Sequence, residues 1–283
     1  MAGLLSGLAG LGLDNLENMD IFEEPKKESD IAPEIVKVEE KDLILDKTFE
    51  CPVCDKKFGA KVMKTGKAKL LSVDQDLRSK YEGIDAVKYD VELCPHCGYA
   101  ALSRYFSQIT GGQAKLIREN ISKNVQLRTY NDEIYSYEEA LERYKLALAN
   151  AVVKRARASE KAYICLKSAW LVRGYQEELE ENGGDRSKIK ELMQMEDQYL
   201  LNAFNGFAEA RQSESFPMCG MDEKTIDYLI AVLALRFKKF DIASRLVASI
   251  LTSPSVNART KDKARDLKEQ ILAEIRKSKE GAQ

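Results

Sequence analysis

Two short stretches, Cys51-Pro52-Val53-Cys54 and Cys94-Pro95-His96-Cys97, decide how the rest of this chain is interpreted. Each places two thiols in one tight turn, so that both sulfurs lie on the same side of the backbone. Two such turns together supply four sulfurs, which is the donor set of a tetrahedral Zn²⁺ site. The sequence therefore predicts one structural zinc ion, bound by Cys51, Cys54, Cys94 and Cys97.

The residues before each cysteine pair alternate as β-strands do, in Thr48-Phe49-Glu50 and in Tyr89-Asp90-Val91-Glu92-Leu93. The pairs are 39 residues apart, whereas a minimal site of this kind has roughly 15–20 residues between them. This spacing indicates a zinc ribbon with an extended hairpin. A thioredoxin-like dithiol is an alternative, but thiol exchange does not need two matched pairs. Catalytic zinc is disfavoured because four thiolates leave no open coordination position for water.

The overall composition excludes several classes of function. The 283 residues include 44 basic and 46 acidic ones, so the net charge of −2 does not point to nucleic acid or membrane. The only histidine is His96, which we expect to be exposed on its turn. A nucleophile–histidine–acid triad would depend on that one residue, and no paired carboxylates or open metal site can be located. We therefore expect a protein that is not an enzyme.

The N-terminal sequence predicts a cytoplasmic location. Residues 1–13 are apolar, but no basic residues precede them and they fall short of the roughly 20 residues that span a bilayer. We therefore expect reduced thiols and no membrane partner. Residues 1–46 contain 4 lysines and 12 acidic residues, which predicts an acidic, largely disordered N-terminal segment.

The remaining chain divides into two predicted domains, and the fold class is α+β, mostly α. Residues 47–105 are expected to form the zinc-ribbon-like domain, and residues 106–283 a tetratricopeptide-like array of helical hairpins. Ser136 and Glu139 have the spacing of a capping box at the start of one helix. The helical periodicity predicts helices at residues 113–128, 136–152, 158–179, 187–212, 222–237, 239–252 and 257–277.

A weak repeat runs through the helical region. Tyr137, Ala140, Tyr144 and Ala147 have a 3-4-3 spacing, which recurs from Leu200 to Ala210 and from Phe240 to Ile250. A small residue on such a stripe lets a neighbouring helix approach closely, as in the second helix of a tetratricopeptide hairpin. The expected partners are the helices at 113–128, 158–178 and 222–237, with 257–277 as a polar last helix. An ordinary helical bundle remains the alternative.

Two longer stretches around the cysteines resemble a bacterial family of unknown function, number 2225 among the domains of unknown function. They are Phe49-Glu50-Cys51-Pro52-Val53-Cys54-Asp55-Lys56-Lys57-Phe58 and Tyr89-Asp90-Val91-Glu92-Leu93-Cys94-Pro95-His96-Cys97-Gly98-Tyr99-Ala100. The resemblance covers roughly residues 47–275. It implies a cytoplasmic protein with a cysteine zinc ribbon, tetratricopeptide-like helices and no assigned activity. The four cysteines match the positions of the family's own.

Two basic stretches are candidate contact sites. The first comprises Lys56, Lys57, Lys61, Lys64, Lys67 and Lys69, with Phe58, Tyr81, Tyr89 and Tyr99 nearby in the sequence. Lysines and aromatic rings together can bind nucleic acid, although lysines on a solvated strand pair also discourage association of strand edges. The second contains Arg155, Arg157 and Lys161, at the corner between two predicted helices. If these residues face a groove, they suit an acidic peptide; otherwise they form a solvated face.

The favoured function at this point is a cytoplasmic zinc-binding adaptor or scaffold. Zinc would stabilise a β-unit too small to bury enough apolar surface by itself. The helices would offer a surface to a protein or peptide partner. The alternative is a nucleic-acid-associated zinc ribbon that uses the stretch from Lys56 to Lys69.

Overall fold

Three antiparallel β-hairpins follow one another in the first part of the computed structural model, which describes residues 38–128, 130 and 132–280. Short 3-10 helices, η3 (Glu40–Leu43) and η4 (Ala86–Tyr89), precede the first and third hairpins. The hairpins are β1 (Ile44–Glu50) with β2 (Lys57–Met63), β3 (Leu70–Val73) with β4 (Ser79–Tyr81), and β5 (Val91–Leu93) with β6 (Ala100–Leu102).

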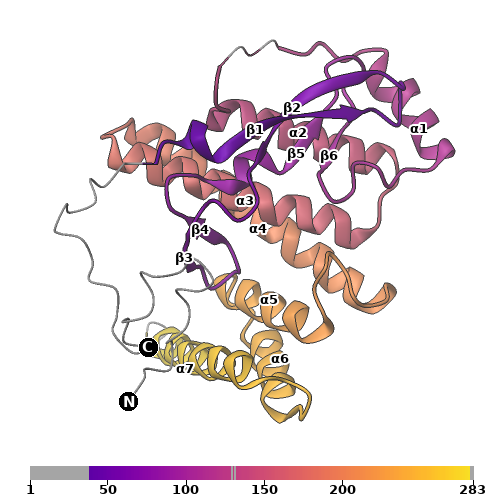
Figure 1. Cartoon of the computed structure of the whole chain (residues 1–283). Coiled ribbons are helices and arrows are strands. Elements are labelled where there is room, and N and C mark those ends of the chain that lie inside the picture. Colours follow the sequence, from indigo (N-terminus) through magenta and orange to yellow (C-terminus); the bar gives the residue numbers. More distant parts are fainter. Residues whose placement is uncertain (1–37, 129, 131, 281–283) are drawn as a thin grey trace, which may run out of the picture. The chain divides into compact units, whose positions relative to one another are not determined.

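The helices follow the hairpins in the chain, and within the described residues there are seven α-helices (Figure 1). A π-helical segment, η5 (Arg118–Ser122), continues directly from the first of them. The helices are α1 (Gly111–Ile117), α2 (Tyr137–Val153), α3 (Ala158–Glu181), α4 (Arg186–Ser213), α5 (Glu223–Arg236), α6 (Phe240–Thr252) and α7 (Ala258–Glu280). The fold class is therefore α+β and mostly α, as the sequence predicts.

Side-chain caps explain where several of these helices begin. Asp185 and Asp222 accept hydrogen bonds from backbone N–H groups in the first turns of α4 and α5. Ser136 accepts one from the N–H of Glu139 at the start of α2. The carboxylate of Glu139 pairs with Arg143 at 2.7 Å. The predicted capping box is therefore only half formed. The Ser136 side chain accepts its hydrogen bond, whereas the Glu139 carboxylate binds the guanidinium of Arg143.

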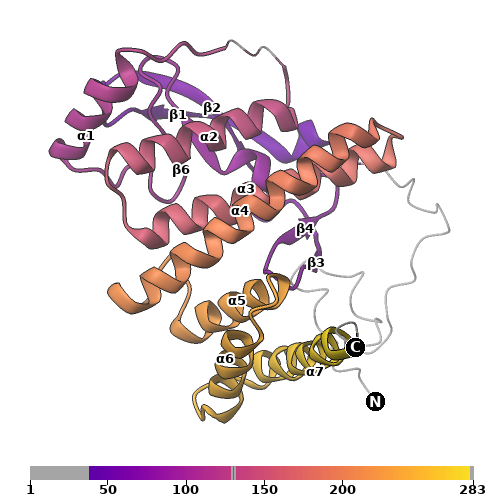
Figure 2. The same cartoon turned by 180° about the vertical axis from the view of Figure 1, so that it is seen from behind.

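The predicted 3-4-3 stripes all face the interior. Tyr144 and Ala147 of α2, Ala203 and Phe207 of α4, and Ala243 of α6 are each at most 1% exposed. Helices α3 and α4 pack against each other, as do α5 and α6, and Figures 1 and 2 show both pairs from opposite sides. These two helical hairpins are the ones that the periodicity predicts.

The first predicted helical hairpin is wrong. The helix expected at 113–128 ends at Ile117 as an α-helix, and α2 packs mainly on α3 and on the β5–β6 hairpin. The physical reason is the direction of the apolar side chains of α1. Ala114 and Ile117 are buried in the cluster around the cysteines, to which α2 contributes Val153 at its C-terminal end, so α1 does not pair along the length of α2.

The structure also differs from the predicted domain boundaries. Residues 38–46 belong to the folded part, because Leu43 and Ile44 pack with Ile84, Tyr89 and Tyr135 in a small core. The acidic segment is therefore shorter than the predicted 1–46, and residues 1–37 lie outside the described part. Val38–Gln283 form one compact unit, so residue 105 does not separate two bodies.

The reason for this single unit is a shared core. Val91 and Leu102, from the third hairpin, belong to the same buried cluster as the residues of α2–α7. Burial of these strands against helices gives the short hairpin a partner that it would lack alone. Among the described helices, none is both long enough and apolar enough to cross a membrane.

Candidate metal centre

Each cysteine pair forms the turn of its own β-hairpin. The first knuckle, residues 51–54, joins β1 to β2, and the second knuckle, residues 94–97, lies between β5 and β6. The sequence instead predicts one extended hairpin between the two pairs. The 39 intervening residues in fact contain β2, the complete β3–β4 hairpin, η4 and β5, which accounts for the unusual spacing.

The two knuckles have the same backbone geometry. The N–H of Cys51 donates to the carbonyl of Lys56, and the N–H of Cys94 donates to that of Tyr99. One residue beyond each pair, Asp55 and Gly98 have left-handed φ angles of 59° and 72°. Their N–H groups donate to the carbonyls of Cys51 and Cys94. Each turn therefore presents its two sulfurs in the same way.

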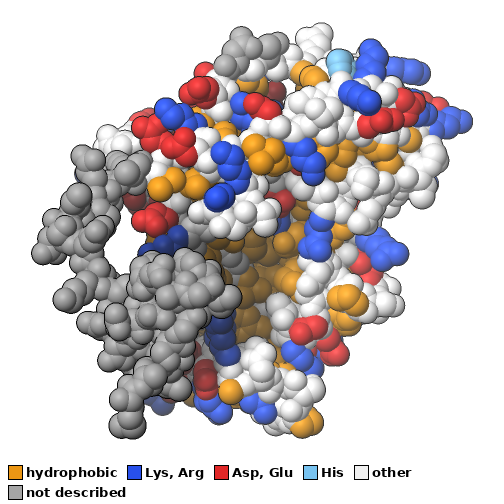
Figure 3. Space-filling view, viewed as in Figure 1, with side chains coloured by type: hydrophobic (Ala, Val, Ile, Leu, Met, Phe, Trp, Pro, Cys, Tyr) orange, Lys and Arg blue, Asp and Glu red, His pale blue; other side chains and the backbone are white. Residues whose placement is uncertain are grey.

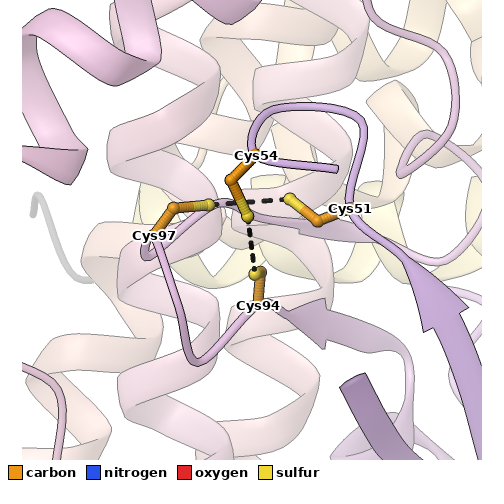
Figure 4. Close-up of side chains that lie close together, drawn as sticks. All are labelled: Cys51, Cys54, Cys94 and Cys97. Carbon is orange, nitrogen blue, oxygen red and sulfur yellow. Dashed lines mark hydrogen bonds between the residues drawn. The ribbon is translucent and has the colours of Figure 1, made fainter. Parts of the chain in front are cut away.

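The four sulfurs converge on one point (Figure 4). Sγ of Cys51 lies 3.5 Å from Sγ of Cys97, and Sγ of Cys54 lies 3.7 Å from Sγ of Cys94. All four sulfurs lie within 4.8 Å of one another. A tetrahedron with metal–sulfur bonds of about 2.3 Å has sulfur–sulfur edges of about 3.8 Å. The cluster thus fits one tetrahedral metal ion, and these four cysteines could hold it.

A disulfide interpretation does not fit these distances. A sulfur–sulfur bond is about 2.05 Å long, and all six cysteines of the chain are free thiols. Cys165 and Cys219 are buried elsewhere and are not part of the cluster. The two knuckles therefore meet as four separate sulfur donors.

Sulfur–sulfur contacts shift the thiol pKa values in opposite directions. Hydrogen bonds with Cys51 and Cys97 lower the pKa of Cys94, whereas its hydrogen bond with Cys94 raises the pKa of Cys51. The hydrogen bond with Cys51 likewise raises the pKa of Cys97. Neighbouring thiols thus favour one thiolate at the expense of the others. A bound divalent cation reverses that preference, because it stabilises every sulfur as a thiolate.

Residues of η5 and α2 donate hydrogen bonds to the backbone of the two knuckles. The guanidinium Nε of Arg118, in η5, donates to the carbonyl of Val53 at 2.6 Å. The amide nitrogen of Asn150, in α2, donates to the carbonyl of Gly98 at 3.0 Å. Asn150 is fully buried and Arg118 is exposed. The helices therefore fix the position of each cysteine turn, although their residues contribute no sulfur.

An aromatic cluster packs beside the sulfurs. The rings of Phe49 and Phe58 stack at 5.8 Å between centroids, and Tyr99 and Phe106 lie 4.9 Å apart. The hydroxyl of Tyr99 donates to the carbonyl of Phe106 at 2.9 Å. The same core contains Cys51, Cys94 and Cys97, of which none is more than 5% exposed. Burial among aromatic rings shields these three cysteines from solvent, whereas Cys54 is partly exposed.

His96 is exposed, as predicted. Its Nε2 lies 3.3 Å from the carbonyl oxygen of Lys57, so a protonated Nε2 donates to that oxygen. His96 therefore joins the second knuckle to β2 and is not one of the clustered ligands.

The lysines of the first basic stretch differ in exposure and in partners. Lys56, Lys57, Lys67 and Lys69 are exposed, whereas Lys61 pairs with Asp46 at 3.3 Å and Lys64 donates to the carbonyl of Asp42. Around the single histidine, basic and acidic side chains lie next to each other (Figure 3). Phe58, Tyr89 and Tyr99 are at most 6% exposed. The expectation that these three rings lie free to stack on bases is therefore wrong, because they belong to the core.

The second basic stretch is divided between two environments. Lys161 lines a groove of about 590 Å³ formed by α2, α3 and α4. Arg155 and Arg157 are exposed at the α2–α3 corner and do not line it. Their neighbour Lys154 is buried and pairs with Glu160 at 2.7 Å. Of the three residues predicted to face a groove, Lys161 alone lines this one.

Arg118 and Asn150 were not predicted from the sequence. Arg118 reaches a carbonyl 65 positions earlier and Asn150 one 52 positions earlier. Nothing in their local sequence distinguishes them from the other polar residues of these helices. Predicting their contacts would have required knowing which helix packs against which knuckle.

Comparison with known proteins identifies the family to which this chain belongs. The profile of one family, described as an uncharacterized protein conserved in bacteria (DUF2225), matches residues 44–271. Searches of curated proteins and of solved structures gave no match. The matched region contains both cysteine knuckles and α1–α6, and extends into α7. The chain therefore belongs to this bacterial family, DUF2225.

Proposed function

We propose that this chain is a non-enzymatic cytoplasmic adaptor, in which one structural zinc ion joins two β-hairpins to a helical body that binds a protein or peptide partner. The observation that carries the proposal is the closed shell of four sulfurs at the meeting point of the two knuckles.

The donor chemistry supports zinc. Thiolate sulfur is a soft ligand, and a tetrahedral set of four sulfurs suits Zn²⁺. When bound, zinc supplies a divalent charge without redox chemistry. The residues of this chain supply the remainder: Asn150 and Arg118 orient the knuckles, and the aromatic core excludes water.

The same closed shell supports a structural role. Four protein ligands use all positions of a tetrahedral ion, so none remains for a substrate or an activated water. Residues 51–54 and 94–97 also come from separate hairpins, and an ion between them joins parts of the chain that do not pair as strands. Zinc is thus expected to contribute folding free energy.

The helical part supports an interaction role. Helices α2, α3 and α4 surround a groove of about 590 Å³, within the size range of binding clefts. An exposed apolar side chain lies here too, since Val152 of α2 lines the groove and is 59% exposed. Such surfaces on α-helical proteins commonly receive another polypeptide.

Chemical cross-linking of the full chain in bacterial cells tests the adaptor proposal. One or a few proteins should cross-link to the chain reproducibly, and purified protein should retain about one zinc per chain. The proposal fails if no protein cross-links. It also fails if RNA or DNA binds with a steep salt dependence that substitution of Lys56 and Lys57 by glutamine abolishes.

A further inference from the structure

We propose that the groove over α3 binds an acidic segment of a partner protein in an extended conformation. This inference rests on the proposed adaptor function and names the surface and the partner chemistry. The groove, here called the α3 groove, is lined by residues of α2 on one side, of α4 on the other and of α3 between them. Figure 2 shows these three helices from the side opposite to that of Figure 1.

The floor of the α3 groove is made of small side chains. Ala158, Ala162 and Cys165 line it from α3, and Gly206 lines it from α4. A Cβ atom added to Gly206 would lie 2.8 Å from the Cβ of Ala162, so the two helices touch closely here. Leu148 and Val152 add an apolar wall from α2. Small side chains leave space above the floor, so a polypeptide segment can approach these helices closely.

One wall of the groove presents a row of amides. Gln198, Asn202 and Asn205 line it from α4, and all three are exposed. Each side-chain amide has N–H donors and a carbonyl acceptor. An extended peptide backbone presents the same two groups in alternation, so one amide can serve both. At about 1.5 Å per residue, Met195 to Glu209 of α4 span about 21 Å, which matches about six residues of extended chain.

The charges facing the α3 groove are mainly positive. Lys145 and Lys161 line it, opposed by Glu209 alone. Within the described residues, neither lysine has a carboxylate oxygen within 4.0 Å of its nitrogen, whereas the nearby Lys154 is paired with Glu160. Arg155 and Arg157 add two exposed basic groups at the adjoining α2–α3 corner. Unpaired lysines on a binding groove are complementary to an acidic segment.

Fluorescence anisotropy with labelled decapeptides tests this assignment. The probe is a peptide of alternating glutamate and leucine, and its control replaces every glutamate by lysine. The acidic peptide should bind to the full chain at least about tenfold more tightly, and its affinity should fall as salt increases. Absence of acidic-peptide binding at low salt overturns the inference, as does equal binding of the two peptides.

Two groove variants separate charge from amide recognition. Lys145→Glu with Lys161→Glu should weaken acidic-peptide binding about tenfold or more. Asn202→Ala with Asn205→Ala should weaken it about fivefold and leave its salt dependence unchanged. The matched control, Lys268→Glu with Lys279→Glu on α7, makes the same charge change outside the groove and should have no such effect. Equal weakening by the control, with all variants folded by circular dichroism, contradicts the site.

A photo-cross-linking residue distinguishes failure of this site from failure of the adaptor function. Placed at Leu148 in the α3 groove, it should capture the partner found by chemical cross-linking in cells, whereas placed at Lys268 it should not. Capture from Lys268 alone would keep the adaptor function and overturn the groove. Absence of a partner in both experiments, together with no peptide binding, would overturn both proposals.

Discussion

The two cysteine knuckles share one backbone geometry but lie in different surroundings. The first, at residues 51–54, ends in the exposed Asp55 and is held by the exposed Arg118. The second, at residues 94–97, ends in the buried Gly98 and is held by the fully buried Asn150. The turn itself is therefore encoded locally, whereas its tolerance to substitution depends on the helices packed against it.

Loss of a ligand should affect both knuckles alike, because the proposed ion would be shared by both. We expect Cys54→Ser and Cys94→Ser each to abolish stoichiometric metal binding and to lower the melting temperature by about 10 °C or more. Cys165→Ala, outside the cluster, should retain the metal. Differential scanning calorimetry and metal analysis on the same samples check this. A Cys54 variant that keeps both its metal and its stability would show that the first knuckle is not required.

Substitution of the residue with the left-handed φ angle, Asp55 or Gly98, should show most clearly that the two knuckles differ in their tolerance to change. In Gly98→Ala, the new Cβ would lie 2.7 Å from a methyl carbon of Val125 at a φ of 72°. Left-handed strain and crowding together should reduce the free energy of unfolding by about 2–4 kcal/mol. Asp55→Ala, at the equivalent exposed position, should cost about 1 kcal/mol or less. Chemical denaturation measures both.

A double variant tests whether crowding is the cause at Gly98. Val125→Ala removes the side chain that the new methyl group would meet. Gly98→Ala should then cost about 1–2 kcal/mol less in the Val125→Ala background than in the original chain. An unchanged cost would assign the whole effect to the φ angle.

Removing the hydrogen bonds that α2 and η5 donate to the knuckles should also destabilise the second knuckle more than the first. The loss of stability should be smaller than for Gly98→Ala. Asn150→Ala leaves the buried carbonyl of Gly98 without this donor and should cost about 1–3 kcal/mol. Arg118→Ala exposes the Val53 carbonyl to water, which can replace the guanidinium, so about 0.5–1 kcal/mol is expected. Urea denaturation of both variants with metal bound gives the comparison. A larger loss for Arg118→Ala would reverse the roles assigned to the two helices.

The smallest predicted effect has the opposite sign. Asp55 has a φ of 59°, a conformation that glycine adopts without a Cβ penalty. Asp55→Gly should therefore stabilise the protein by about 0.5–1 kcal/mol and leave the metal content unchanged. Thermal unfolding measures this. Destabilisation would mean that the Asp55 side chain has a role beyond the turn.

Local features made much of this structure predictable. The four cysteines were identified because each pair needs only a two-residue spacing to form a turn. The buried faces of α2, α4 and α6 followed from helical periodicity. What the sequence could not show is which segments meet: the hairpin partners of β2 and β5, the packing of Ile117 beside the cysteines, and the contacts of Arg118 and Asn150.

The predicted domain boundaries were wrong for a related reason. Charge counting assigned residues 38–46 to the acidic tail, yet Leu43 and Ile44 are buried in a small core, and β1 pairs with β2 along its whole length. The predicted boundary at residue 105 failed because Val91 and Leu102 contribute to the helical core. Composition averages over such single anchoring residues, whereas packing depends on them.

X-ray absorption spectroscopy at the zinc edge, combined with metal quantification on the purified full chain, tests whether the four cysteines bind one zinc ion. We expect one zinc per chain with four sulfur neighbours at about 2.3 Å. A chain that folds without stoichiometric metal, or a zinc ion with nitrogen or oxygen in its first coordination sphere, would contradict it.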